Sequence, residues 1–235
     1  EAIAEVLQGG RIRNAINMPS IDPKDLLTLQ PYLDLCHRLG SFARQSAQEN
    51  VSSINITFWG GIVDFDSIPL TRAVQKGWLA GIAGDGGIND VNAPHKIKSL
   101  GIQVEVTKSS SVVDYNELIE VKTLSSDGMA RSVKGTLLGK ANDPRIVEVD
   151  SQAIEVRPVD LLLVVRNVDK PGIVGKLGTI LGDRGVNIAN MSLSRADCGE
   201  LALTICELDQ EPDEGVLRIL EADSDIREAR ISRQG

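Results

Sequence analysis

The sequence predicts an α+β chain of two domains. Helical spacing of apolar residues dominates its first part, and short alternating segments follow. Its last part reads strand, helix, strand, strand, helix, strand, the order of a ferredoxin-like unit. We therefore expect the end of a helix and a linker at 1–17, an α+β domain at 18–153, a joint at 154–159 and a ferredoxin-like βαββαβ domain at 160–235.

Composition narrows the class of protein. With 42% hydrophobic and 25% charged residues, the chain has the make-up of an ordered globular protein. A net charge of −8 without a Lys/Arg run argues against nucleic-acid binding, and no apolar run reaches the ~20 residues of a membrane span. The three cysteines Cys36, Cys198 and Cys206 form no CxxC pattern, which favours reduced thiols and no metal site. A cytoplasmic protein is expected, or a plastid one if the source is a plant.

The beginning of the chain has no basic segment of a signal peptide and is typical of the tail of an amphipathic helix. We expect it to be cut from a longer protein. After Pro19, the pair Asp22-Pro23 has the composition of a helix start, and apolar residues at threes and fours predict a helix over 23–48. Pro31 is expected to divide this helix into a short turn and a longer piece.

A strand that begins at Val51 and ends at Gly60-Gly61, a helix capped by Ser67 and a helix over 93–100 ended by Gly101 are expected next. Gly84–Gly87 is predicted to be a turn or mobile loop. Antiparallel-type strands follow around 102–106, 118–121, 133–138 and 146–149, with a hairpin turn at 125–128.

In the last domain, an apolar strand at 161–165 precedes a helix that begins at Pro171 and ends at Gly185. At 100° per residue, one face of this helix is expected to turn inward and carries Ile173, Val174, Leu177, Ile180 and Leu181. The opposite face carries Gly175, Gly178 and Gly182, each costing roughly 1 kcal/mol against alanine. Our hypothesis is that another backbone approaches this bare face; the alternative is an exposed helix of poor propensity.

A strand opening at Val186, a third strand at 201–208 reached through 197–199 and a final strand at 226–231 complete the domain. Pro212 is expected to open its second helix, with Val216, Ile219 and Leu220 inward.

A polar loop at 167–175 and the polar residue Asn187 lie at opposite ends of the first of these helices. Across two copies of the unit, such an arrangement could hold a small polar ligand. The simpler explanation is that Asp169 caps the helix and Asn187 relaxes the turn after Gly185.

The segments 168–175 and 185–189 resemble an ACT domain, most closely that of the D-3-phosphoglycerate dehydrogenase family. Upstream, 13–19 resembles the exit from that family's catalytic body, and 31–40, 90–94 and 135–139 resemble its intervening domain. The resemblance implies L-serine as effector, bound between paired ACT domains of a homo-oligomer. It assigns ligand contacts to Asn167, Asp169, Gly172, Ile173, Val174 and Asn187, with Asn167 standing where many members carry His or Tyr.

The resemblance also implies anion binding by the intervening domain, through Lys108, assisted by Lys134 or Arg145. Solvated surface charge is the alternative explanation for these three residues. A signal from serine is expected to pass through the joint into the intervening domain.

No glycine fingerprint for NAD is present, because the closest segment, 81–87, has the wrong spacing and no βαβ context. His37 and His95 lie in predicted helices without catalytic neighbours. We therefore expect no catalytic residue and no cofactor in this chain, with NAD and the catalytic and nucleotide-binding domains belonging to the parent enzyme. The alternatives are a free-standing amino-acid sensor or oligomerisation module, and an enzyme with an unrecognised site.

Overall fold

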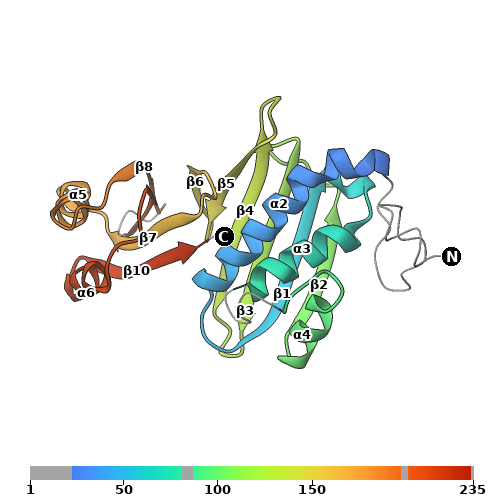
Figure 1. Ribbon diagram of the computed structural model, residues 1–235, viewed down its shortest axis with the longest axis horizontal. Coiled ribbons are helices and arrows are strands. Elements are labelled where there is room, and N and C mark those ends of the chain that lie inside the picture. The colour runs from blue at the N-terminus through green and yellow to red at the C-terminus, as the bar shows by residue number, and fades with distance from the viewer. Residues whose placement is uncertain (1–22, 81–86, 197–200, 234–235) are drawn as a thin grey trace, which may run out of the picture.

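A computed structural model describes residues 23–80, 87–196 and 201–233 of the chain (Figure 1). It contains a six-stranded sheet of order β2-β1-β3-β4-β5-β6 and a four-stranded sheet of order β10-β7-β9-β8. The α+β class is thus confirmed. The expectations for 1–17, for most of the loop at 84–87 and for the connection at 197–199 fall outside the described residues.

The long helix α2 (Pro23–Ser46) runs unbroken through Pro31, so the predicted division of this helix is wrong. Pro31 costs the helix one backbone hydrogen bond. The complete burial of Leu35, Leu39 and Phe42 further along α2 stabilises the helix by more than this loss. The next helix, α3 (Ser67–Leu79), is capped by Asp66 and not by Ser67, since the Asp66 carboxylate accepts from the Ile68 N–H at 3.0 Å. The short helix α4 (Ala93–Ser99) ends before Gly101, as expected.

Helices α2 and α3 touch backbone to backbone through two glycines. A Cβ atom on Gly40 would lie 2.1 Å from the Val74 carbonyl oxygen, and one on Gly77 would lie 1.9 Å from the His37 carbonyl oxygen. The crossing therefore depends on both positions lacking a side chain.

The helices cover one face of the six-stranded sheet (Figure 1). After β1 (Val51–Gly60) and the short 3₁₀ helix η1 (Gly61–Asp64), α3 and α4 return the chain so that β2 (Gln103–Ser109) pairs parallel with β1. The expected antiparallel strand is therefore wrong here, because a helical crossover brings the chain back to the same end of the sheet. The remaining strands are antiparallel: β3 (Glu117–Ser125), β4 (Ala130–Leu138), β5 (Asp143–Val149) and β6 (Gln152–Val156).

Residues 154–156 of the expected joint are the end of β6 and belong to the sheet. The turn before it holds Asp150 and Ser151 at φ of 49° and 65°, the left-handed pair that a two-residue hairpin needs. The connection between the two sheets is consequently only 157–160.

The second sheet is fully antiparallel and has the ferredoxin-like order. Its elements are β7 (Leu161–Val168), α5 (Ile173–Asp183), β8 (Ile188–Arg195), β9 (Leu201–Leu208), α6 (Glu214–Ala222) and β10 (Ile226–Arg233). The prediction that Pro171 and Pro212 begin the two helices is wrong, because α5 begins at Ile173 and α6 at Glu214. Gly172, at φ 96°, is the N-cap of α5, and the Asp213 carboxylate caps α6 by accepting from the Val216 N–H at 3.1 Å.

The inward faces of α5 and α6 are narrower than predicted. Ile173, Leu177 and Leu181 are buried as expected, whereas Val174 is 50% exposed and Ile219 is 41% exposed. Val174 and Ile219 lie at the margin of the apolar face of their helix. A helix that packs on a single sheet buries only the centre of that face.

The two faces of the four-stranded sheet have different neighbours. Helices α5 and α6 cover the outer face, away from the six-stranded sheet (Figure 1). The inner face contributes Leu162, Val164, Leu203 and Ile205 to the same apolar core as α2, Ile154 and Val156. Within the described residues, no helix is long and apolar enough to cross a membrane.

Candidate functional site

The turn before α5 carries the first group of predicted ligand residues. The Asp169 carboxylate lies 3.1 Å from the Arg195 Nε, and its side chain is 20% exposed while that of Arg195 is 72% exposed. Asp169 does not cap α5, because Gly172 is the N-cap residue and the helix start has no capping hydrogen bond from a side chain. The simpler explanation of Asp169 is thereby wrong, and a carboxylate–guanidinium pair lies beside the helix start instead.

Backbone geometry brings the other turn residues to this pair. The Gly172 carbonyl accepts from the Lys176 N–H at 2.9 Å and so begins the helical ladder. Ile173 anchors the first turn in the core, and Val174 points outward. N–H groups at the start of a helix lack helical partners, so this turn offers donors and a positive dipole end to an anion.

Asn167 lies beneath this turn rather than on its surface. Its side chain is buried, with Nδ2 donating to the Val168 carbonyl at 2.8 Å and Oδ1 accepting from the Thr204 hydroxyl at 3.3 Å. Both ends of the amide are thus used inside the domain, where they stabilise the end of β7.

Two lysines fix the same turn from the other side. Lys170 Nζ lies 2.6 Å from the Asp225 carboxylate, and Lys176 Nζ lies 2.6 Å from Asp223 and 3.0 Å from Asp225. These lysines hold the pKa of both carboxyl groups below the usual value for aspartate, with Lys170 the first cause at Asp225 and Lys176 at Asp223. The turn is therefore tied to the loop between α6 and β10.

Asn187 lies at the far end of α5, exposed, with its Nδ2 donating to the Asp209 carboxylate. The 11 residues of α5 separate it from Asp169 by roughly 16 Å at 1.5 Å per residue. One chain therefore does not bring the two residues together, and a small ligand could meet both only between two copies.

The glycine face of α5 is open. Cβ atoms built on Gly175, Gly178 and Gly182 would meet nothing within 4 Å in the part of the chain that the structure describes. In the same domain, β8 is the edge of its sheet and exposes Leu193. The glycine face of α5 could therefore accept a neighbouring backbone.

Arg195 is the functional candidate that the sequence analysis missed. The sheet register places it opposite Ala202 of β9, which in turn lies opposite Asn167 of β7. This row across the sheet is what brings the end of β8 to the turn at Asp169. The ferredoxin-like strand order could have revealed the proximity, whereas spacing along the chain could not.

The three basic residues expected to bind an anion each have partners. Lys108 Nζ donates to the Val63 and Phe65 carbonyls at 2.8 and 2.7 Å. Lys134 lies 2.7 Å from Glu148, and Arg145 lies 2.8 Å from Asp143. Strands β1 and β3 lie between β2 of Lys108 and β4 of Lys134, which separates them by roughly 14 Å at ~4.8 Å per strand. As placed, the three residues do not share one pocket.

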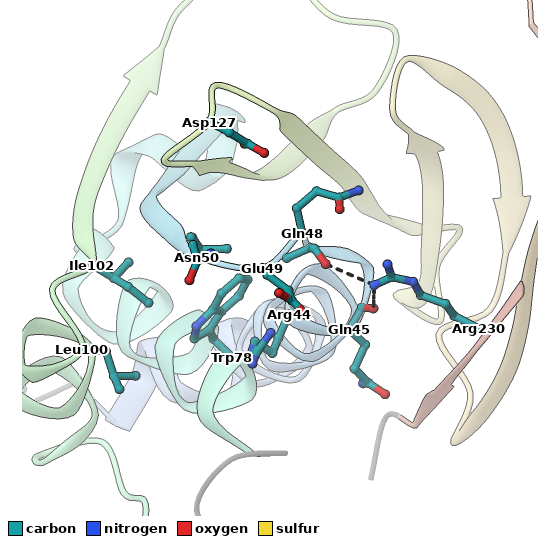
Figure 2. Close-up of a pocket in the computed structure, with 12 residues that line it drawn as sticks. Arg44, Gln45, Gln48, Glu49, Asn50, Trp78, Leu100, Ile102, Asp127 and Arg230 are labelled. Carbon is teal, nitrogen blue, oxygen red and sulfur yellow. Dashed lines mark hydrogen bonds between the residues drawn. The ribbon is translucent and has the colours of Figure 1, made fainter. Parts of the chain in front are cut away.

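A cleft of about 1110 Å³ opens where α2 ends, next to β10 (Figure 2). The Arg44 guanidinium lies 5.6 Å from the centroid of the buried Trp78 ring on one side of it. On the other side, Arg230 of β10 donates to the Gln45 and Ala47 carbonyls, both at 3.1 Å. The cleft is therefore lined by residues of both domains, the one with the six-stranded sheet and the one with the four-stranded sheet. No sequence motif indicated this location.

Metal and thiol chemistry are not indicated for the residues that are described. No group of three or more His, Cys, Asp or Glu side chains there is arranged to hold a metal ion. Cys36 and Cys206 are buried free thiols, and burial raises the pKa of Cys206 to about 12. Both are therefore protonated and poorly nucleophilic.

Two family models match separate parts of the chain. Residues 28–150 match the family model of the D-3-phosphoglycerate dehydrogenase intervening domain, and residues 161–225 match that of the ACT domain. Curated relatives named D-3-phosphoglycerate dehydrogenase include those of Methanocaldococcus jannaschii, 32% identical over 98% of this chain, and of Synechocystis sp., 34% identical over 97%. The chain spans 43% and 41% of the lengths of these two relatives.

Proposed function

Since the chain belongs to the family of the D-3-phosphoglycerate dehydrogenase intervening domain and carries an ACT domain behind it, we propose that it senses L-serine for an NAD-dependent D-3-phosphoglycerate dehydrogenase. The parent enzyme would act in L-serine biosynthesis in the cytoplasm, and its catalytic and nucleotide-binding domains would supply the chemistry. In this proposal the chain itself contributes ligand binding and assembly.

The observation that carries the proposal is the Asp169–Arg195 pair beside the start of α5. An α-amino acid presents an ammonium and a carboxylate on adjacent atoms. Asp169 suits the ammonium, while Arg195 and the helix N–H groups suit the carboxylate. Asn187 of a second copy would supply an amide that both donates and accepts.

Calorimetry with L-serine, D-serine and glycine tests the ligand. We expect L-serine to bind and D-serine to bind at least about tenfold more weakly, because its hydroxymethyl group points away when ammonium and carboxylate are held. Binding of none of the three would remove the sensing role and leave the alternative, an ACT-type oligomerisation module. Dehydrogenase turnover by this chain alone, with NAD and 3-phosphoglycerate, would contradict the proposal that catalysis belongs to other domains of the parent enzyme.

Association through the glycine face is tested by Gly178→Leu. A Cβ atom on Gly178 would meet nothing within 4 Å among the described residues, so the domain is expected to fold, whereas a partner backbone on this face would be pushed away. We expect analytical ultracentrifugation to show at least about a tenfold weaker dimer, with weaker L-serine binding. Thr179→Leu, at the next position of α5, which is exposed, is the matched control. Unchanged association of Gly178→Leu would exclude this face as the contact.

A further inference from the structure

A closed ring of four charges spans the boundary between the intervening domain and the ACT domain. Asp150 Oδ2 pairs with Arg131 at 2.9 Å and also with Arg166, while Glu228 Oε2 accepts from Arg131 and Arg166, each at 3.0 Å. Arg131 and Asp150 belong to the six-stranded sheet and its turn, and Arg166 and Glu228 belong to β7 and β10. Each carboxylate thus binds an arginine from each domain, and Glu228 Oε1 also pairs with Arg230 of β10 at 2.5 Å.

The ring is held in place from both sides. Asp150 sits in the left-handed hairpin turn between β5 and β6, and its second oxygen accepts from the Ser132 N–H at 2.8 Å. Glu228 and Arg166 face each other in the register of β10 and β7. The four side chains are only 16–22% exposed, so salt screens them poorly and loss of one leaves the others unbalanced.

Other contacts cross the same boundary. Arg230 donates to the Gln45 and Ala47 carbonyls where α2 ends. The Arg233 N–H donates to Gln45 Oε1 at 2.7 Å, and the Ser41 hydroxyl donates to the Arg233 carbonyl at 3.0 Å. Below them lies the shared apolar core of α2, β6, β7 and β9. The connection at 157–160 is therefore only one of several links between the domains.

We propose that the intervening and ACT domains form one mechanical unit, locked by the ring of Arg131, Asp150, Arg166 and Glu228, so that they move and unfold together. A change at the ACT turn then displaces the intervening domain as a body and does not bend the connection at 157–160. The inference rests on the proposed function only for the passage of a serine signal; the locking itself needs no ligand.

Calorimetric unfolding of the 235-residue chain, compared with Arg131→Met and Glu228→Gln, tests the lock. We expect one transition for the wild type, with equal calorimetric and van't Hoff enthalpies. In the two variants the transition splits or falls by at least about 6 °C. Lys134→Met is the matched control, since Lys134 has a similar exposure and pairs at 2.7 Å with Glu148 inside the intervening domain. Two transitions in the wild type, or shifts no larger than that of Lys134→Met, would overturn the proposal.

Native-state hydrogen exchange gives a second measurement that does not depend on a variant folding. Amides of β4 and of β7 in the wild type are expected to share one opening free energy. On adding L-serine, added protection should reach α2 and β4; protection confined to 160–235 would refute transmission as a body. If no L-serine binds at all, the proposed ligand fails while the exchange of the free chain still decides the lock.

Discussion

Replacing Gly77 by alanine is expected to lower the free energy of unfolding by about 3 kcal/mol, the upper range for overpacking a tight contact. The added methyl would lie 1.9 Å from the His37 carbonyl oxygen and 3.0 Å from the Ser41 nitrogen. Both neighbours are backbone atoms of α2, so no side chain can rotate away. Helices α2 and α3 would have to separate, opening the core around Leu39 and Val74.

Urea unfolding followed by circular dichroism measures this loss. Gly178→Ala is the control, because its methyl meets nothing within 4 Å among the described residues and alanine favours a helix by roughly 1 kcal/mol. The two changes are therefore expected to have opposite signs. Equal effects would show that helix propensity, and not the crossing of α2 and α3, decides the outcome at Gly77.

Asp169→Asn is expected to weaken L-serine binding roughly tenfold to a hundredfold, since a hydrogen bond to a charged group contributes about 1.5–3 kcal/mol. The substitution keeps the size of the side chain and removes the charge that would receive the ammonium. Arg195→Gln is expected to weaken binding by a similar factor from the carboxylate side. Titration calorimetry on both variants measures the change.

The control for these two variants is Glu214→Gln on α6, which breaks an exposed ion pair with Arg218 at 2.9 Å, away from the turn. It should leave serine affinity within about twofold of the wild type. If Glu214→Gln weakens binding as much as Asp169→Asn does, the effect is one of overall charge. If neither Asp169→Asn nor Arg195→Gln changes the affinity, serine binds elsewhere.

Local sequence patterns were sufficient for most of the elements. The spacing of apolar residues predicted the helix α5 and the burial of Ile173, Leu177 and Leu181. This works because residues one turn apart decide which face of a helix is apolar. The helix start was harder: Pro171 has the right composition, yet Gly172 at φ 96° makes a further turn before α5 begins. A left-handed glycine at a cap is a backbone choice that composition does not reveal.

Relations between distant segments were not predictable from spacing. The parallel pairing of β2 depends on where the α3–α4 crossover returns, and Arg195 meets Asp169 only once β9 lies between β7 and β8. The same holds for the ring around Asp150, whose members come from four segments between residues 131 and 228. Each of these contacts is fixed by tertiary packing.

The aromatic residues of the chain are distributed unequally between its domains. Both tryptophans, Trp59 and Trp78, lie in the intervening domain, while residues 160–235 contain no tryptophan and no tyrosine. Trp78 is buried beneath Arg44 at the cleft that Arg230 borders from the ACT side. Intrinsic tryptophan fluorescence consequently comes from the intervening domain alone. A change in emission when a ligand binds the ACT domain would therefore show, without any label, that binding alters the surroundings of a tryptophan in the other domain.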